Sequence, residues 1–140
     1  MTGRLADVLV VGAFTVFAAA GLGLVAVNPV IGSTDRVEIH IRYSHYDPSQ
    51  VVVPAGRPVT IVLHNDDPIE HEWIVADAAV HELHRTGSEA HHGARPTEIS
   101  IPALSTVETT ITFDHALAWQ YICHLPGHEA YGMVGLLIAR

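Results

Sequence analysis

The chain has 140 residues, the size of a single domain, and 15 acidic residues against seven basic ones give it a formal charge of −8. All seven basic residues are arginines, and this acidic balance argues against a nucleic-acid-binding protein, because binding to phosphates depends on positive charge. A single cysteine excludes an internal disulfide, whereas eleven histidines are more than a core requires and suggest metal binding.

The first predicted element is an apolar N-terminal segment. Residues 8–27 carry no charge and are long enough to cross a bilayer as a helix, with Arg4 on the cytoplasmic side. A signal peptide cleaved after Ala20 is the alternative, but the apolar stretch continues past that site. We therefore predict that residues 1–34 are a membrane anchor or signal segment with a linker. Either interpretation exports the remaining chain to the periplasm or the cell exterior, membrane-anchored or, after cleavage, secreted.

The remaining chain is predicted to be a β-sandwich. From residue 36 onward, short apolar or alternating segments are separated by turn sequences such as Asp47-Pro48 and Pro-Ala-Gly at residues 54–56. About eight strands at near-regular spacing indicate an all-β fold with Greek-key connections. The strands are expected at residues 37–44, 50–53, 59–63, 72–76, 98–101, 107–113, 119–123 and 133–139.

A His-rich insert interrupts this pattern at residues 77–96. Its first part is compatible with one or two helical turns, and its second part, which contains Gly87 and Gly93, is typical of a loop. The insert is a candidate for a second, more weakly held metal site, in which Glu82 or Glu89 would join the histidines, and a solvated loop is the alternative. The histidines concerned are His81, His84, His91 and His92.

The C-terminal segment contains the donor set that decides the functional interpretation. Cys123, His128 and Met133 follow one another at the spacing C-x4-H-x4-M, and His71 lies about fifty residues earlier, just before the apolar Trp73. Two histidines, one cysteine and a weak axial methionine are the ligands of a mononuclear blue copper site. The alternatives are a buried inert thiol, two loop histidines and a methionine that fills the core.

Other polar residues surround these candidates. His124 follows Cys123 directly, so its side chain should face the opposite side of the strand and not bind the same ion. Asn65 is a candidate for a hydrogen bond across to the cysteine loop, and an ordinary turn asparagine is the alternative. The acidic residues around His71 either steer a basic partner or simply add solubilising charge. These acidic residues are Asp66, Asp67, Glu70 and Glu72. The histidines expected to be solvated or to lie on a strand face are His40, His45, His64 and His115.

Together these residues resemble the cupredoxins, the family of plastocyanin, azurin and rusticyanin. The resemblance covers residues 36–140 and is supported by YSHYDPSQVVVPAGRPVTIVLHNDDPIEHEW in the first half of the domain and by YICHLPGHEAYGMVG, which is similar to a rusticyanin-like ligand loop. It implies a cupredoxin domain over residues 35–140 that holds one copper ion. His71, Cys123 and His128 would be the equatorial ligands and Met133 the axial one.

A copper site of this kind in an exported domain predicts a one-electron carrier on the outer face of the membrane. It would dock briefly with a redox partner protein and have neither a small-molecule substrate nor a nucleic-acid partner. A copper-handling protein for storage, delivery or resistance, with a second metal in the insert, is the alternative. An enzyme is not expected, because the four-ligand site has no open coordination position and the sequence has no His-x-His pair for a trinuclear copper cluster.

Overall fold

The computed structural model describes residues 35–87 and 95–140. The predicted anchor at residues 1–34 and the insert residues Glu89, His91 and His92 lie outside this range. Within it, the chain forms nine strands and one helix, so the prediction of a mainly β fold is confirmed. No helix in this described part has the length and apolar character needed to cross a bilayer.

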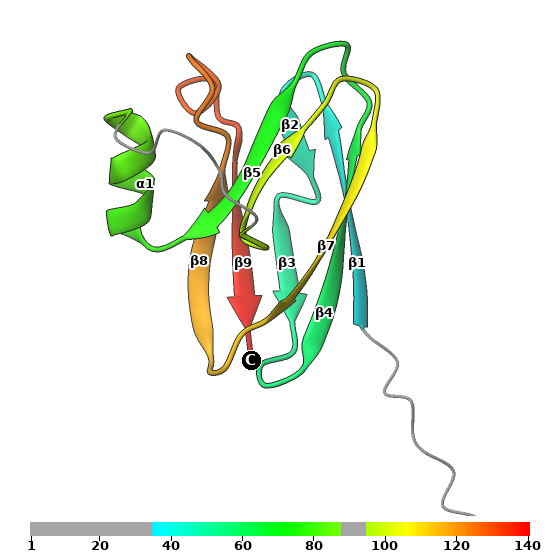
Figure 1. Ribbon diagram of the computed structural model, residues 1–140, viewed down its shortest axis with the longest axis vertical. Helices are drawn as coiled ribbons and strands as arrows, with labels where there is room; N and C mark the ends of the chain where they lie inside the picture. Colours follow the sequence, from blue (N-terminus) through cyan, green and yellow to red (C-terminus); the bar gives the residue numbers. More distant parts are fainter. Residues whose placement is uncertain (1–34, 88–94) are drawn as a thin grey trace, which may run out of the picture. The chain divides into compact units, whose positions relative to one another are not determined.

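The strands form two mixed sheets (Figure 1). The elements in chain order are β1 (Asp35–Arg42), β2 (His45–Asp47), β3 (Gln50–Val53), β4 (Pro58–Asn65), β5 (His71–Ala76), α1 (Ala78–Arg85), β6 (Glu98–Ile101), β7 (Thr106–Thr112), β8 (Leu117–Ile122) and β9 (Val134–Ala139). One sheet has the order β2-β1-β4-β7 and the other β3-β9-β8-β5-β6. The pairs β1–β4 and β3–β9 are parallel, and the others are antiparallel.

Apolar side chains from both sheets meet in one core. Ile39 and Ile61 come from the first sheet, and Trp73, Tyr121 and Leu137 come from the second; all five have no exposed surface. Burying a large apolar side chain stabilises the fold by about 1.5–3 kcal/mol, whereas an exposed ion pair contributes at most about 1 kcal/mol. The core therefore holds the sandwich together and provides a fixed base for the loops.

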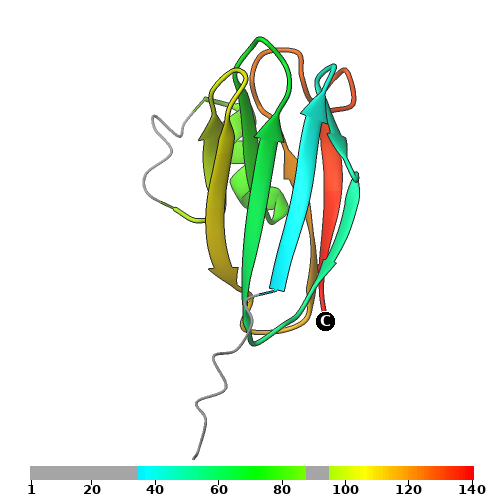
Figure 2. The same cartoon turned by 90° about the vertical axis from the view of Figure 1, so that its right-hand side faces the viewer.

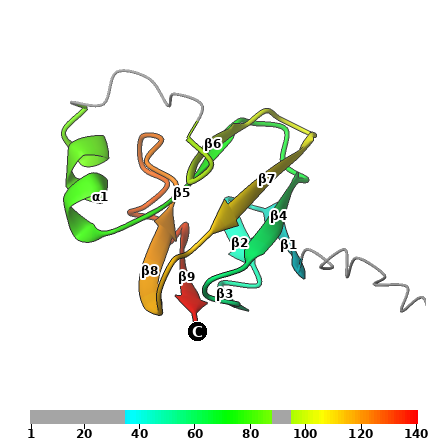
Figure 3. The same cartoon turned by 60° about the horizontal axis from the view of Figure 1, so that its bottom comes forward.

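The first part of the insert is a helix of two turns, α1, which agrees with the longer of the two predicted helix lengths. Asp77 caps it, because its side chain accepts hydrogen bonds from the N–H groups of Ala79 and Val80. Figure 3 shows α1 beside the segment that follows β8. His81 is the buried residue of the helix and faces that segment.

Several strand connections meet at one end of the sandwich, opposite the C-terminus (Figures 1 and 2). The turn between β1 and β2 is joined to the β4–β5 connection through hydrogen bonds from the N–H groups of Tyr43 and Ser44 to Asp67. The β6–β7 connection is joined to it through the Leu104 N–H, which donates to the carbonyl of Asp67. The candidate ligands lie at this end.

Candidate metal centre

Three of the predicted ligands converge. His71 begins β5, Cys123 directly follows β8, and His128 lies in the connection between β8 and β9. Cys123 Sγ lies 3.3 Å from His128 Nδ1, which lies 3.2 Å from His71 Nδ1, and one donor atom from each residue lies within 4.8 Å of the others. His71 and Cys123 are fully buried and His128 is half-buried. The three side chains are thus close enough to share one ion.

A tight loop brings His128 back toward the thiol. Gly127 has a φ of +87°, a conformation that glycine adopts without the steric cost paid by other residues. The His128 N–H donates to the carbonyl of Leu125, and the Tyr131 N–H donates to the carbonyl of Gly127. These backbone bonds fix the position of the loop without any contribution from a metal.

Met133 closes the same loop. Its side chain is fully buried, and its N–H donates to the carbonyl of His128 at 3.0 Å. The Cys123 N–H donates in turn to the carbonyl of Met133 at 3.3 Å. The backbones of the three C-terminal candidates are therefore linked, and axial ligation by the Met133 sulfur stays a prediction.

The protonation of His71 follows from its second nitrogen. His71 Nε2 lies 3.0 Å from Oδ2 of Asp67, and an ionised carboxylate only accepts hydrogen bonds, so Nε2 carries the hydrogen. Burial raises the pKa of Asp67, but hydrogen bonds from Ser44, Tyr43 and His71 outweigh it and lower the pKa overall. Burial lowers the pKa of His71. A neutral His71 therefore presents the lone pair of Nδ1 to the site.

The thiol is protonated when no metal is bound. Burial raises the pKa of Cys123 to about 11, although the N–H groups of Glu72 and Leu125 oppose this shift. The Glu72 N–H points at Sγ from 3.3 Å. A metal ion must therefore displace a proton from the thiol, which couples binding to proton release. A thiolate and two imidazoles suit first-row metals that accept soft ligands, such as copper and zinc.

Asn65 has a different role from the predicted one. Its side-chain amide donates to the carbonyls of Ile69, Ile101 and Pro102, and its oxygen accepts from the Asp67 N–H. The predicted bond to the cysteine loop is not among its hydrogen bonds to the described residues. Asn65 instead fixes the connection that leads into His71.

The acidic residues around His71 do not act alike. Asp67 is buried beneath His71, and Asp66 is paired with Arg42 at 2.7 Å and with His40 at 3.1 Å. Glu70 is exposed and Glu72 half-buried. The prediction of a group of four surface charges is wrong for Asp67, because its carboxylate is used inside the protein.

Sequence reasoning missed how the other histidines group. His124 turns away from the thiol, as predicted, but its Nε2 lies 2.9 Å from Nδ1 of His81. On the outer face of the first sheet, His40 and His64 stack at 4.5 Å, and Glu38 brings a third donor atom within 4.8 Å. The parallel register of β1 and β4 places His40 beside His64, and sequence periodicity does not reveal that register.

Comparison with known proteins agrees with this geometry. A family profile described as a cupredoxin-like domain matches residues 8–99. Two relatives are described as the copper-resistant cuproprotein CopI. The one from Pseudomonas aeruginosa is 27% identical over 136 residues, covering 74% of this chain and 75% of the relative. The one from Rubrivivax gelatinosus is 30% identical over 99 residues, covering 68% of this chain and 59% of the relative.

Among solved structures, auracyanin A from Chloroflexus aurantiacus, described as a "blue" copper protein, is 26% identical with a TM-score of 0.61. The match covers 77% of this chain and 100% of that one. The family profile includes His71 but ends before Cys123. The candidate ligands Cys123, His128 and Met133 therefore lie outside the profile match, and their placement comes from the geometry of the structure.

Replacing Asp67 by Asn should destabilise the metal-free protein by about 1–3 kcal/mol at pH 7. The NH₂ group of the asparagine would face an N–H donor from which the carboxylate accepts a hydrogen bond. A group with a lowered pKa stabilises the fold above its usual pKa, so the difference should shrink below about pH 4. Urea denaturation at pH 7 and pH 3 measures it. The matched control is Asp66→Asn, at an exposed ion pair, with an effect below about 1 kcal/mol. Equal losses in both variants would contradict this role for Asp67.

Proposed function

The chain belongs to the cupredoxin family, and on that premise we propose that it binds one copper ion in a mononuclear type 1 site and carries single electrons. The observation that supports this most directly is the convergence of His71, Cys123 and His128 at a buried point. Met133 is proposed as the weak axial ligand. When bound, copper supplies a one-electron couple, and the chain's own residues supply a fixed environment for it.

The surroundings of the ligands suit this role. Asp67 holds the ring of His71 through Nε2, and the Glu72 N–H holds the sulfur of Cys123. The backbone bonds of the His128 loop restrict movement of that ligand. A site in which each ligand is held by the protein changes little when the charge of its ion changes, and this favours rapid electron transfer.

The end of the sandwich that surrounds His128 is apolar and exposed. Four large apolar side chains of the connections at this end are exposed, with fractions of 89% for Tyr43, 47% for Ile69, 72% for Leu104 and 79% for Tyr131. Apolar side chains gathered at one end indicate an interaction surface. We propose that a redox partner protein docks here transiently, and that the exposed Glu70 assists the approach of a basic partner.

We also propose that the domain is exported from the cytoplasm. Residues 1–34 would hold the domain on the outer face of the membrane, or direct its secretion if they are cleaved. A buried ion with four protein ligands leaves no position for a substrate, so we propose no enzymatic activity. The acidic chain is proposed to bind no nucleic acid.

Copper handling is the second candidate function. The observation that favours it is the similarity to two proteins described as copper-resistant cuproproteins. In that role the protein would take up, store or deliver copper, and a second metal site near α1 would add capacity. The two functions differ in whether the ion leaves the protein when it is reduced.

Cu(II) added to the metal-free protein should bind with one intense visible charge-transfer band, because the thiolate of Cys123 donates to the ion. Cys123→Ser should abolish the band and weaken binding at this site by more than about 100-fold, since even the loss of an outer partner costs about 10–100-fold. His115→Gln, at an exposed loop, is the control and should retain the band. A colourless Cu(II) complex of the unaltered protein would reject the type 1 site.

Replacing Met133 by Leu preserves the side-chain volume and removes the sulfur. Copper should remain bound, and the reduction potential should rise, because the weak axial donor favours Cu(II) over Cu(I). Protein-film voltammetry measures the shift. The control is Leu137→Met at a buried position in β9, which should leave the potential unchanged. An unchanged potential in the Met133 variant would show that its sulfur is no ligand.

A carrier and a copper-handling protein respond differently to reduction. As a carrier, the copper-loaded protein should recover its full visible band after repeated reduction and reoxidation in the presence of an excess Cu(I) chelator. His71 and Cys123 are fully buried, so the chelator can approach only along the half-buried His128 and should remove copper slowly. Transfer of the copper that produces the band to the chelator within the first cycle would instead favour handling. Absorbance of the protein and of the chelator complex are recorded together.

A further inference from the structure

A second pair of imidazoles faces each other between α1 and the segment after β8. His124 Nε2 lies 2.9 Å from His81 Nδ1, and the ring centroids are 5.2 Å apart. His81 is 2% exposed, and the side chain of His124 is 4% exposed. Two buried imidazole nitrogens at this distance must share either a hydrogen or an ion.

The other nitrogen of each ring already uses the hydrogen that a neutral imidazole has. His81 Nε2 lies 3.3 Å from the carbonyl oxygen of Gln120, and His124 Nδ1 lies 3.3 Å from a carboxylate oxygen of Glu129. Both partners only accept hydrogen bonds, so the hydrogens lie on these two nitrogens. The facing nitrogens therefore both hold lone pairs, which repel each other unless a cation lies between them.

The first site shows the same arrangement. His71 donates through Nε2 to Asp67 and turns Nδ1 toward Nδ1 of His128 at 3.2 Å. Nitrogens bound at about 2.0–2.1 Å to one ion lie roughly 2.9–3.4 Å apart when the bond angle is about 90–110°. Both pairs fall in this range, so the criterion that fits the first site also selects His81 and His124.

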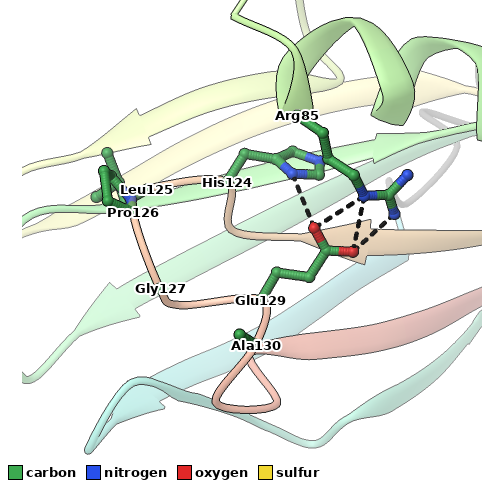
Figure 4. Close-up of a pocket in the computed structure, with 7 residues that line it drawn as sticks. All are labelled: Arg85, His124, Leu125, Pro126, Gly127, Glu129 and Ala130. Carbon is green, nitrogen blue, oxygen red and sulfur yellow. Dashed lines mark hydrogen bonds and ion pairs between the residues drawn. The ribbon is translucent and has the colours of Figure 1, made fainter.

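The local charge permits a cation at this point. Arg85 lies close by, but its guanidinium forms three hydrogen bonds with Glu129, at 2.6, 3.0 and 3.1 Å (Figure 4). These hydrogen bonds are the main reason why the pKa of Glu129 is lowered, so the carboxylate is ionised and balances the arginine. An ion between the two imidazoles would meet no net positive charge from this pair.

Further donors and space adjoin the two nitrogens. The ring of His84 stacks on His124, with centroids 5.4 Å apart and an interplanar angle of 4°, and its side chain is 3% exposed. A pocket of about 360 Å³ borders His124 and Glu129 and opens to solvent (Figure 4). A metal ion could therefore reach His124 from solvent through this pocket.

We propose that His81 Nδ1 and His124 Nε2 are two ligands of a second transition-metal site, beside the stacked ring of His84. Imidazole donors suit copper and zinc, and copper(II) forms the tighter complex, so copper(II) is the expected occupant. The site differs from a cluster made by the insert alone, because half of the pair comes from the residue after Cys123. It does not rest on the proposed function, since neither residue belongs to the first site.

Copper counting on the full-length protein tests this site. Metal-free protein is dialysed against Cu(II), and total copper and the thiolate band are then measured. The unaltered chain should hold two ions, and His81→Gln and His124→Asn should each hold one while the band stays unchanged. Gln and Asn retain a donor toward Gln120 and Glu129 and remove only the facing lone pair. The unchanged band also shows that each variant is folded.

Two further variants separate this site from the first. Cys123→Ser should lose the band and retain one ion, and His115→Gln should retain both ions and the band. One ion per unaltered chain would mean that the two imidazoles share only a proton, and this would overturn the proposal. Two ions in both His81→Gln and His124→Asn would place the second ion elsewhere and would equally overturn it.

Discussion

The hydrogen bond from His71 to Asp67 is the contact on which the metal centre depends. The carboxylate accepts from His71 Nε2 and from the N–H groups of Tyr43 and Ser44, so it joins the ligand to the turn between β1 and β2. It decides which nitrogen of His71 carries the hydrogen and which one faces Cys123 and His128. A site residue that sequence reasoning treated as surface charge thus sets the chemistry of the first ligand.

The loop that carries the C-terminal candidate ligands is fixed by backbone hydrogen bonds rather than by a side chain. Cys123, His128 and Met133 are connected through carbonyl and N–H groups of one loop. This difference affects metal uptake. The Nδ1 lone pair of His71 is ready to bind an ion, whereas the buried thiol of Cys123, with a pKa of about 11, keeps its proton at neutral pH. Only an ion that binds thiolate strongly can replace that proton at neutral pH.

Local patterns allowed most of the fold and the first site to be predicted. Alternation and turn sequences located eight of the nine strands in the described part of the chain, and the missed β2 has only three residues. The spacing of Cys123 and His128 is local, so the sequence alone showed it. The parallel pairing of β1 with β4 and the contact between His81 and His124, 43 residues apart, depend on tertiary packing. No periodicity in the sequence encodes either of them.

The proposed second site changes how the two candidate functions relate. Its proposed ligand His124 is joined to Cys123 by a single peptide bond, but the two side chains face opposite directions. At the first site, His71 and Cys123 are fully buried in the core, which suits an ion that stays bound through many redox cycles. The second borders an open pocket, which suits an ion that exchanges. A chain with both sites would carry electrons at one and take up or release copper at the other, so the two functions need not exclude each other.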